Sequence, residues 1–142
     1  MSKHILCAVD LTHTDDSKAL VAEAGRLAEL QGATLSLVTV LPDYGTSFVG
    51  SFFKDGTLKE AGEAARVALH ALADEVLPSH GKIQCIVEIG TVYEKTLEAA
   101  KLCNADLIVV GAHKPDLADR VIGPNASRVA RFADVSVLIA RL

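Results

Sequence analysis

The chain has 142 residues, half of them hydrophobic and 4% aromatic, which fits a single domain over residues 1–142 with an aliphatic core. Its 14 basic and 18 acidic residues give a net charge of −4, and no basic run is present that would favour a nucleic-acid or anionic-lipid partner. No apolar run has the length of a membrane span or a signal-peptide core, so we expect a soluble, cytoplasmic protein.

The first part of the chain predicts a strand, a helix and a second strand. Residues 4–9 are apolar at nearly every position, which is typical of a strand buried on both faces of a parallel sheet. The helix expected at residues 15–31 ends at Gly32, a residue suited to a left-handed cap. A strand at 33–41 follows, and the Gly, Ser and aromatic residues of 42–56 predict a mobile loop over the strand ends.

The next helix has the clearest periodic pattern in the chain. Its apolar residues recur at spacings of three and four: Leu58, Ala61, Ala65, Leu69, Leu72 and Val76. Pro78 and Gly81 end it, and residues 83–89 form the third predicted strand.

Two more strands and two more helices complete the pattern. Thr91 and Glu94 open a helix with the spacing of a reciprocal capping box. Strands are expected at 106–112 and 135–140, and the helix between them begins near Pro124, since proline loses nothing at a first helical position.

This alternation of strands and helices predicts an α/β fold. With right-handed crossovers it gives a five-stranded parallel sheet with helices on both faces. Cys7, Cys85 and Cys103 are odd in number and far apart, and two of them lie in strand-like runs, so we expect buried, reduced thiols.

A ligand of such a sheet is expected beyond the carboxyl ends of the strands, where the winding direction reverses. Asp10 closes the first strand, where a carboxylate is costly unless it meets water, a ligand or a helix N-terminus. Two interpretations stay open for it: a cap of the first helix, or an acceptor of hydrogen bonds from the base or ribose of a ligand.

The segment from Gly111 to Gly123 is the second candidate element of this site. Glycine lets backbone approach a ligand, and amides from Asn125 to Ser127 at the start of the last helix are suited to an anion. Positive charge is added by His113, Lys114 and Arg120. Two glycines at a strand exit and before a helix are also ordinary turn chemistry, and local physics alone favours the turn.

Motifs of other chemistries are absent from the sequence. It contains no GxxxxGK[ST], HExxH or GxSxG, and no Cys/His pairing for a metal. Asp10 as a phosphoryl acceptor ranks third, because Leu11 and Thr12 add no second metal-binding acid. We therefore expect no catalytic residue and no metal site. For weak ATP hydrolysis, His113 and Asp116 are the only nearby candidates to position a water.

The strand "ILCAVD" followed by Thr12, the run "ADLIVVGAH" and the tail "GPNASRVARFADVSVLIAR" resemble the universal stress protein family over nearly the whole chain. The resemblance implies a Rossmann-like sheet of strand order 3-2-1-4-5 and a homodimer paired through the last strand, Val135 to Ala140. An exposed apolar edge strand gives an independent reason for that pairing. It also implies that Asp10 and Val40 hold adenosine.

The phosphate half of the site departs from the family pattern. ATP-binding members have Gly-x-x-Gly, nine residues, then Gly and a hydroxyl residue. Here Gly111 matches the first glycine, Lys114 replaces the second, and eight residues separate Lys114 from Gly123. Pro124 replaces the hydroxyl residue and removes a backbone N–H as well, although Asn125 and Ser127 offer partial compensation.

Two functions follow from the resemblance. The first is a regulatory dimer of the stress response that binds ATP, with or without magnesium. Its phosphates would meet a set of residues around the loop: Gly111, His113, Lys114, Gly123, Asn125 and Ser127. The second is a dimeric protein-interaction module that binds no nucleotide, with its loop closed by Lys114 and Pro124. The first is slightly favoured.

Overall fold

The computed structural model describes residues 3–42, 55–112 and 122–142. The loop expected at 42–56 therefore lies almost wholly outside the described residues, as do His113, Lys114 and Arg120.

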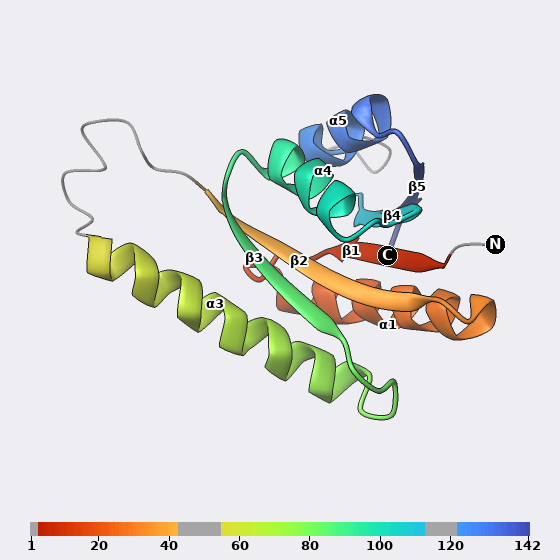
Figure 1. Ribbon diagram of the computed structural model, residues 1–142, viewed down its shortest axis with the longest axis horizontal. Helices are drawn as coiled ribbons and strands as arrows, with labels where there is room; N and C mark the ends of the chain where they lie inside the picture. The colour runs from red at the N-terminus through yellow and green to blue at the C-terminus, as the bar shows by residue number, and fades with distance from the viewer. Residues whose placement is uncertain (1–2, 43–54, 113–121) are drawn as a thin grey trace.

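Strands and helices alternate along the chain in the predicted order (Figure 1). The strands are β1 (His4–Ala8), β2 (Thr34–Pro42), β3 (Gln84–Gly90), β4 (Leu107–Gly111) and β5 (Ser136–Ala140). The helices are α1 (Thr14–Gln31), α3 (Asp55–Val76), α4 (Val92–Leu102) and α5 (Pro124–Phe132). Neighbouring strands all pair in parallel in the order β3-β2-β1-β4-β5, so the expected fold class and strand order are confirmed.

The sheet separates two apolar layers, with α1 and α3 on one face and α4 and α5 on the other (Figure 1). Successive side chains of a strand point to opposite faces. Accordingly, Ile5 and Cys7 of β1 pack in the α1/α3 layer, whereas Leu6 packs in the α4/α5 layer. All three are fully buried, which confirms that β1 is covered on both faces.

The helix boundaries follow the predicted residues, with one exception. Gly32 caps α1 in the left-handed conformation at φ 63°, and Pro124 is the first residue of α5. Thr91 is the N-cap of α4, but the predicted capping box is wrong, because no side chain caps this terminus. The carboxylate of Glu94 instead accepts a hydrogen bond from the Tyr93 hydroxyl at 3.2 Å.

The apolar stripe predicted for α3 is buried from Ala65 to Leu72 and not at its ends. Leu69 is fully buried and Leu72 is 5% exposed, whereas Leu58 is 38% exposed and Ala61 is also exposed. Figure 1 gives the reason: the first turns of α3 extend past the sheet, where no strand lies beneath them.

The three cysteines are free thiols, as expected. Burial raises the pKa of Cys7 to about 12 and also raises the pKa values of Cys85 and Cys103. Burial of Cys85 and Cys103 is only partial. None of the helices in the described part of the chain has the length and apolar character needed to cross a membrane.

Candidate functional site

The carboxyl ends of the parallel strands form the edge where the sequence predicted a ligand. β2 and β4 lie on either side of β1, so the winding direction reverses between β1 and β4. A backbone hydrogen bond of 2.7 Å from Val9 N to Val38 O continues the β1–β2 pairing up to this edge. The topology therefore predicts that this edge contains Asp10, Val40, Gly111 and the start of α5. We call this edge the rim.

Asp10 orders the turn between β1 and α1. Its Oδ1 accepts hydrogen bonds from the Thr12 amide at 2.9 Å and from the Thr12 hydroxyl at 2.6 Å. The backbone carbonyl of Asp10 accepts from the Ser17 hydroxyl and from the His13 amide. Because His13 is the N-cap of α1, the interpretation of Asp10 as the helix cap is wrong.

The second oxygen of Asp10 faces a different environment. Oδ2 lies 3.8 Å from His13 Nε2, and the Asp10 side chain is 61% exposed. A carboxylate that is ordered through one oxygen and has a largely exposed side chain is able to accept hydrogen bonds from a bound hydroxyl or amine.

Val40 and Gly111 provide the apolar and open parts of the rim. Val40 is half-buried and packs in the α4/α5 layer. Gly111 is exposed, and a Cβ added there would meet Leu20 Cδ2 at 3.7 Å, an ordinary contact. Within the described neighbourhood, packing alone does not require glycine at this position.

The start of α5 offers backbone amides rather than side-chain donors. Gly123 is the N-cap, in an extended conformation with φ −60° and ψ 159°, and no side chain caps the terminus. Asn125 and Ser127 are exposed, and the Ser127 amide donates to Gly123 O at 3.0 Å. The amides of Asn125 and Ala126 stand in the first turn, where a helix offers no acceptor, while Pro124 has no amide hydrogen.

Six of the eight predicted site residues are thus described on or near this rim: Asp10, Val40, Gly111, Gly123, Asn125 and Ser127. His113 and Lys114 lie outside the described residues. In the parts of the chain that are described, no group of three or more His, Cys, Asp or Glu side chains is arranged to hold a metal.

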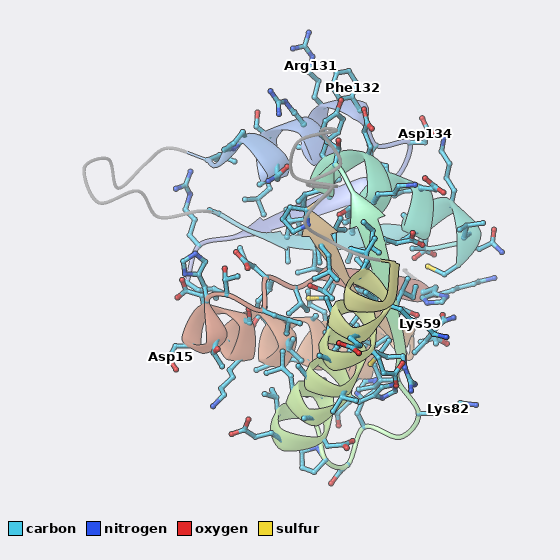
Figure 2. The ribbon with its side chains drawn as sticks, turned by 90° about the vertical axis from the view of Figure 1, so that its left-hand side faces the viewer. Asp15, Lys59, Lys82, Arg131, Phe132 and Asp134 are labelled. Atoms are coloured by element: carbon cyan, nitrogen blue, oxygen red, sulfur yellow. The ribbon has the colours of Figure 1, made fainter. Side chains whose placement is uncertain are left out.

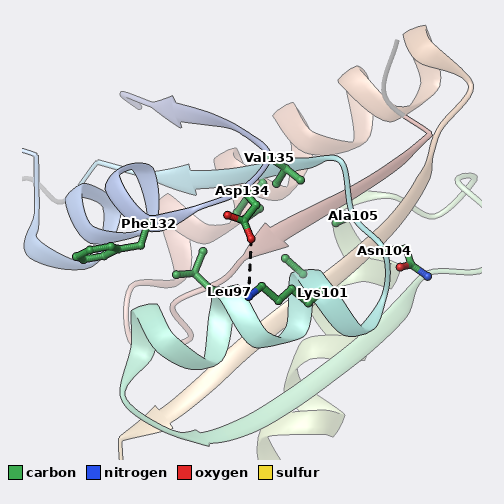
Figure 3. Close-up of a pocket in the computed structure, with 9 residues that line it drawn as sticks. Leu97, Lys101, Asn104, Ala105, Phe132, Asp134 and Val135 are labelled. Carbon is green, nitrogen blue, oxygen red and sulfur yellow. Dashed lines mark ion pairs between the residues drawn. The ribbon is translucent and has the colours of Figure 1, made fainter.

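Sequence reasoning missed a hollow and an aromatic cluster elsewhere. A hollow of about 330 Å³ lies between α4, the amino end of β4 and the segment that follows α5 (Figure 3). Beside it, Tyr93 and Phe132 pack with ring centroids 6.0 Å apart. The spacing of four between Arg128 and Phe132 on α5 was the available signal, because it puts both on one helix face.

The fold and this rim define a class of protein. The model of the universal stress protein family matches residues 1–141, so the chain belongs to the universal stress protein family.

Individual relatives agree with this assignment. The chain is 29% identical over 143 residues to Universal stress protein G of Shigella flexneri, covering 99% of this chain and all of the relative. Among solved structures, it is similar to a universal stress protein in complex with cAMP, with a TM-score of 0.73 and 23% identity over 98% of this chain and 97% of that one. It is also similar to a universal stress protein from Archaeoglobus fulgidus in complex with dAMP, with a TM-score of 0.63 and 22% identity over 96% of both chains.

Proposed function

We propose that this universal stress protein binds an adenine nucleotide, ATP in the first instance, at the rim between β1 and β4. The observation that carries the proposal is the geometry of Asp10, whose Oδ1 is fixed by Thr12 while the side chain remains 61% exposed. Val40 supplies an apolar wall beside it for a base. Two structural relatives in complex with cAMP and dAMP support the choice of an adenine nucleotide.

The phosphates are assigned to the opposite side of the rim. There the proposal uses the amides of the first turn of α5, together with Gly111, Gly123, Asn125 and Ser127. His113 and Lys114 belong to the proposed set as well, although they lie outside the described residues.

A second candidate function is a dimeric interaction module without a nucleotide. The observation that favours it is Pro124 at the first position of α5, which removes one amide donor from the phosphate side. In both candidates the protein is a cytoplasmic regulator of the stress response with no catalytic activity.

The homodimer is proposed to form through β5. This strand is at the edge of the sheet, and Leu138 on it is 37% exposed. A second β5 related by a two-fold axis would pair the free backbone groups. Leu138→Lys should convert a dimeric mass in light scattering to a monomeric one, whereas Leu102→Lys on α4 should not. A monomeric wild-type mass at micromolar concentration would remove the proposal.

The first test is to denature the purified protein and identify any released nucleotide by ion-exchange chromatography. An adenine nucleotide near one per chain would support the first candidate. The second test adds ATP and magnesium to nucleotide-free protein. A ligand that binds only the folded state at a concentration 100 times its Kd stabilises that state by about 2.7 kcal/mol, so the melting temperature should rise.

A matched pair of variants assigns the effect to the rim. Asp10→Asn should reduce the ATP-induced shift, because an amide offers an NH₂ donor and one oxygen where the carboxylate offers two acceptor oxygens. Asp15→Asn changes the charge equally on the exposed first turn of α1 and should keep the full shift (Figure 2). Empty protein with no shift at millimolar ATP would exclude the first candidate and leave the second.

A further inference from the structure

Four side chains on the outer side of α4 and α5 form a row in which two adjacent aromatic rings lie between two arginines. The guanidinium carbon of Arg128 lies 5.5 Å from the ring centroid of Tyr93, and that of Arg131 lies 5.5 Å from the ring centroid of Phe132. The two rings are 6.0 Å apart and tilted by 31°. We call Arg128, Tyr93, Phe132 and Arg131 the arginine–aromatic ladder. Arg131 and Phe132 project from the outer end of the molecule in Figure 2.

The two arginines of the ladder differ from other arginines of the protein in their charge partners. Arg26 and Arg66 each contact a glutamate three residues earlier on the same helix. For Arg128 and Arg131, no carboxylate of the described residues lies within ion-pair distance. The sequence of α5, PNASRVARF, contains no acidic residue at all. The ladder therefore presents two arginine charges on a chain of net charge −4, and the adjoining carboxylate is Glu94, which accepts a hydrogen bond from the Tyr93 hydroxyl.

An apolar hollow adjoins the ladder and shares Phe132 with it. The hollow has a volume of about 330 Å³ (Figure 3). Its apolar lining is Leu97, Ala100, Ala105, Ile108, Phe132 and Val135. Lys101 and Asp134, 3.8 Å apart, form an ion pair at its mouth. Phe132 is 54% exposed, so a large apolar surface is available between the hollow and the two arginines.

We propose that the ladder and the hollow together bind an acidic segment of a partner protein. An aliphatic or aromatic side chain of that segment enters the hollow, and flanking carboxylates contact Arg128 and Arg131. Stacking on the rings holds the two guanidinium groups in place, which lowers the conformational entropy lost when they bind. This combination of an apolar anchor and a charged rim is typical of protein interfaces.

The charges argue against two other occupants. A second copy of the chain that docked the same patch against itself would bring the arginines of the two ladders together, at a cost in like-charge repulsion. A nucleic acid requires an extended basic surface, whereas this patch contains two arginines on a chain with an acidic net charge. The hollow lies at the amino end of β4 and the rim at the carboxyl end, so the apolar anchor of the partner and the proposed nucleotide occupy opposite edges of the sheet.

The test begins with selection of a phage-displayed library of random peptides on the nucleotide-free protein. Each round includes counter-selection on the double variant Arg128→Glu with Arg131→Glu. Peptides enriched on the wild type should combine acidic residues with an aliphatic or aromatic residue. Their affinity is then measured by fluorescence anisotropy, and it should fall as salt is raised, because exposed charge contacts are screened.

Matched variants locate the binding site. The double variant should weaken the selected peptides by about tenfold, the effect of about 1.4 kcal/mol from two exposed charge contacts. Arg26→Glu with Arg66→Glu makes the same charge change on α1 and α3 and should leave the affinity unchanged. Phe132→Ala should also weaken binding, whereas Leu102→Ala, at a 72% exposed residue that does not line the hollow, should not.

Three results would overturn the proposal. One is the absence of peptides enriched over the counter-selection. Another is enrichment of peptides that lack acidic residues or that bind the double variant equally well. The third is a change in the mass of the protein in light scattering upon Arg128→Glu with Arg131→Glu, which would assign the ladder to contact with a second copy of the chain.

Discussion

The centre of the sheet and its carboxyl edge differ in how deeply their side chains are buried. In the centre, three consecutive residues of β1, Ile5 to Cys7, are fully buried between two layers of helices. At the edge, the Asp10 side chain is 61% exposed, and Asn125 and Ser127 are exposed as well. The residues that stabilise the fold are therefore not the residues available to a ligand. The edge is able to change, as Pro124 illustrates, without loss of the family's fold.

The largest effect should come from truncating a side chain in the centre. Leu37 of β2 is fully buried in the α1/α3 layer. Leu37→Ala should lower the free energy of unfolding by about 2–5 kcal/mol, because it removes apolar contacts and leaves a cavity. Urea denaturation measures the change. Leu30→Ala, at a 69% exposed residue of α1, is the control and should stay within about 0.5 kcal/mol of the wild type.

The helix layer that covers the centre should resist added volume. A Cβ on Gly25 of α1 would lie 2.5 Å from Leu77 Cδ2, closer than side chains approach. Gly25→Leu should therefore lower the free energy of unfolding by about 1–3 kcal/mol through overpacking. Gly62→Leu is the matched control on α3, because no atom lies within 4 Å of its added Cβ. It should not destabilise, since leucine favours a helix over glycine. Equal losses would contradict tight packing between α1 and Leu77, the residue that follows α3.

Burial of Cys7 in the centre should appear as a dependence of stability on alkaline pH. Its pKa is raised from 9.0 to about 12 in the folded protein, so the unfolded chain ionises first as the pH rises. The stabilisation is complete below pH 9 and is lost up to about pH 12, at a limiting slope of about 1.4 kcal/mol per pH unit. The free energy of unfolding, measured by urea denaturation between pH 8 and 10, should fall less steeply with pH for Cys7→Ala than for the wild type. Identical slopes would contradict a deeply buried thiol.

The same contrast explains what could be predicted from the sequence. Burial on both faces leaves a pattern, and the run at residues 4–9 predicted β1 (His4–Ala8) correctly to within one residue. A side-chain cap at a helix N-terminus depends on which donor the side-chain oxygen accepts a hydrogen bond from. Glu94 had the spacing of a capping box, yet it bonds Tyr93, and the N-cap of α1 is His13 instead of Asp10. At the candidate site, topology predicts Asp10 at the carboxyl edge of the sheet, but its bonds to Thr12 depend on turn geometry that no periodicity encodes.

The sequence offered only part of the signal for the hollow and the ladder, for another physical reason. Phe132 of α5 meets residues of α4 in both: it lines the hollow with Leu97, and it packs on Tyr93 in the ladder. These residues are far apart in sequence, and their contacts depend on how the two helices pack. A spacing pattern within one helix records which residues share a face, and it carries no information about the opposing helix.

The smallest expected effect concerns the amino edge of the sheet, where a carboxylate joins two segments that are far apart in the sequence. Asp106 accepts hydrogen bonds from the amides of Lys3 at 2.8 Å and His4 at 3.3 Å, and fastens the start of the chain to β4. The Lys3 amide is the largest cause of a lowered pKa at this carboxyl. The stabilisation is therefore present above the ordinary value of 3.8 and is lost as the pH falls through the lowered pKa. Asp106→Asn should lower the urea midpoint slightly at pH 7, and the gap to the wild type should close at acidic pH, when both side chains are neutral. If the difference in urea midpoint between the two proteins stays constant down to acidic pH, the charge of Asp106 does not help to hold the start of the chain against β4.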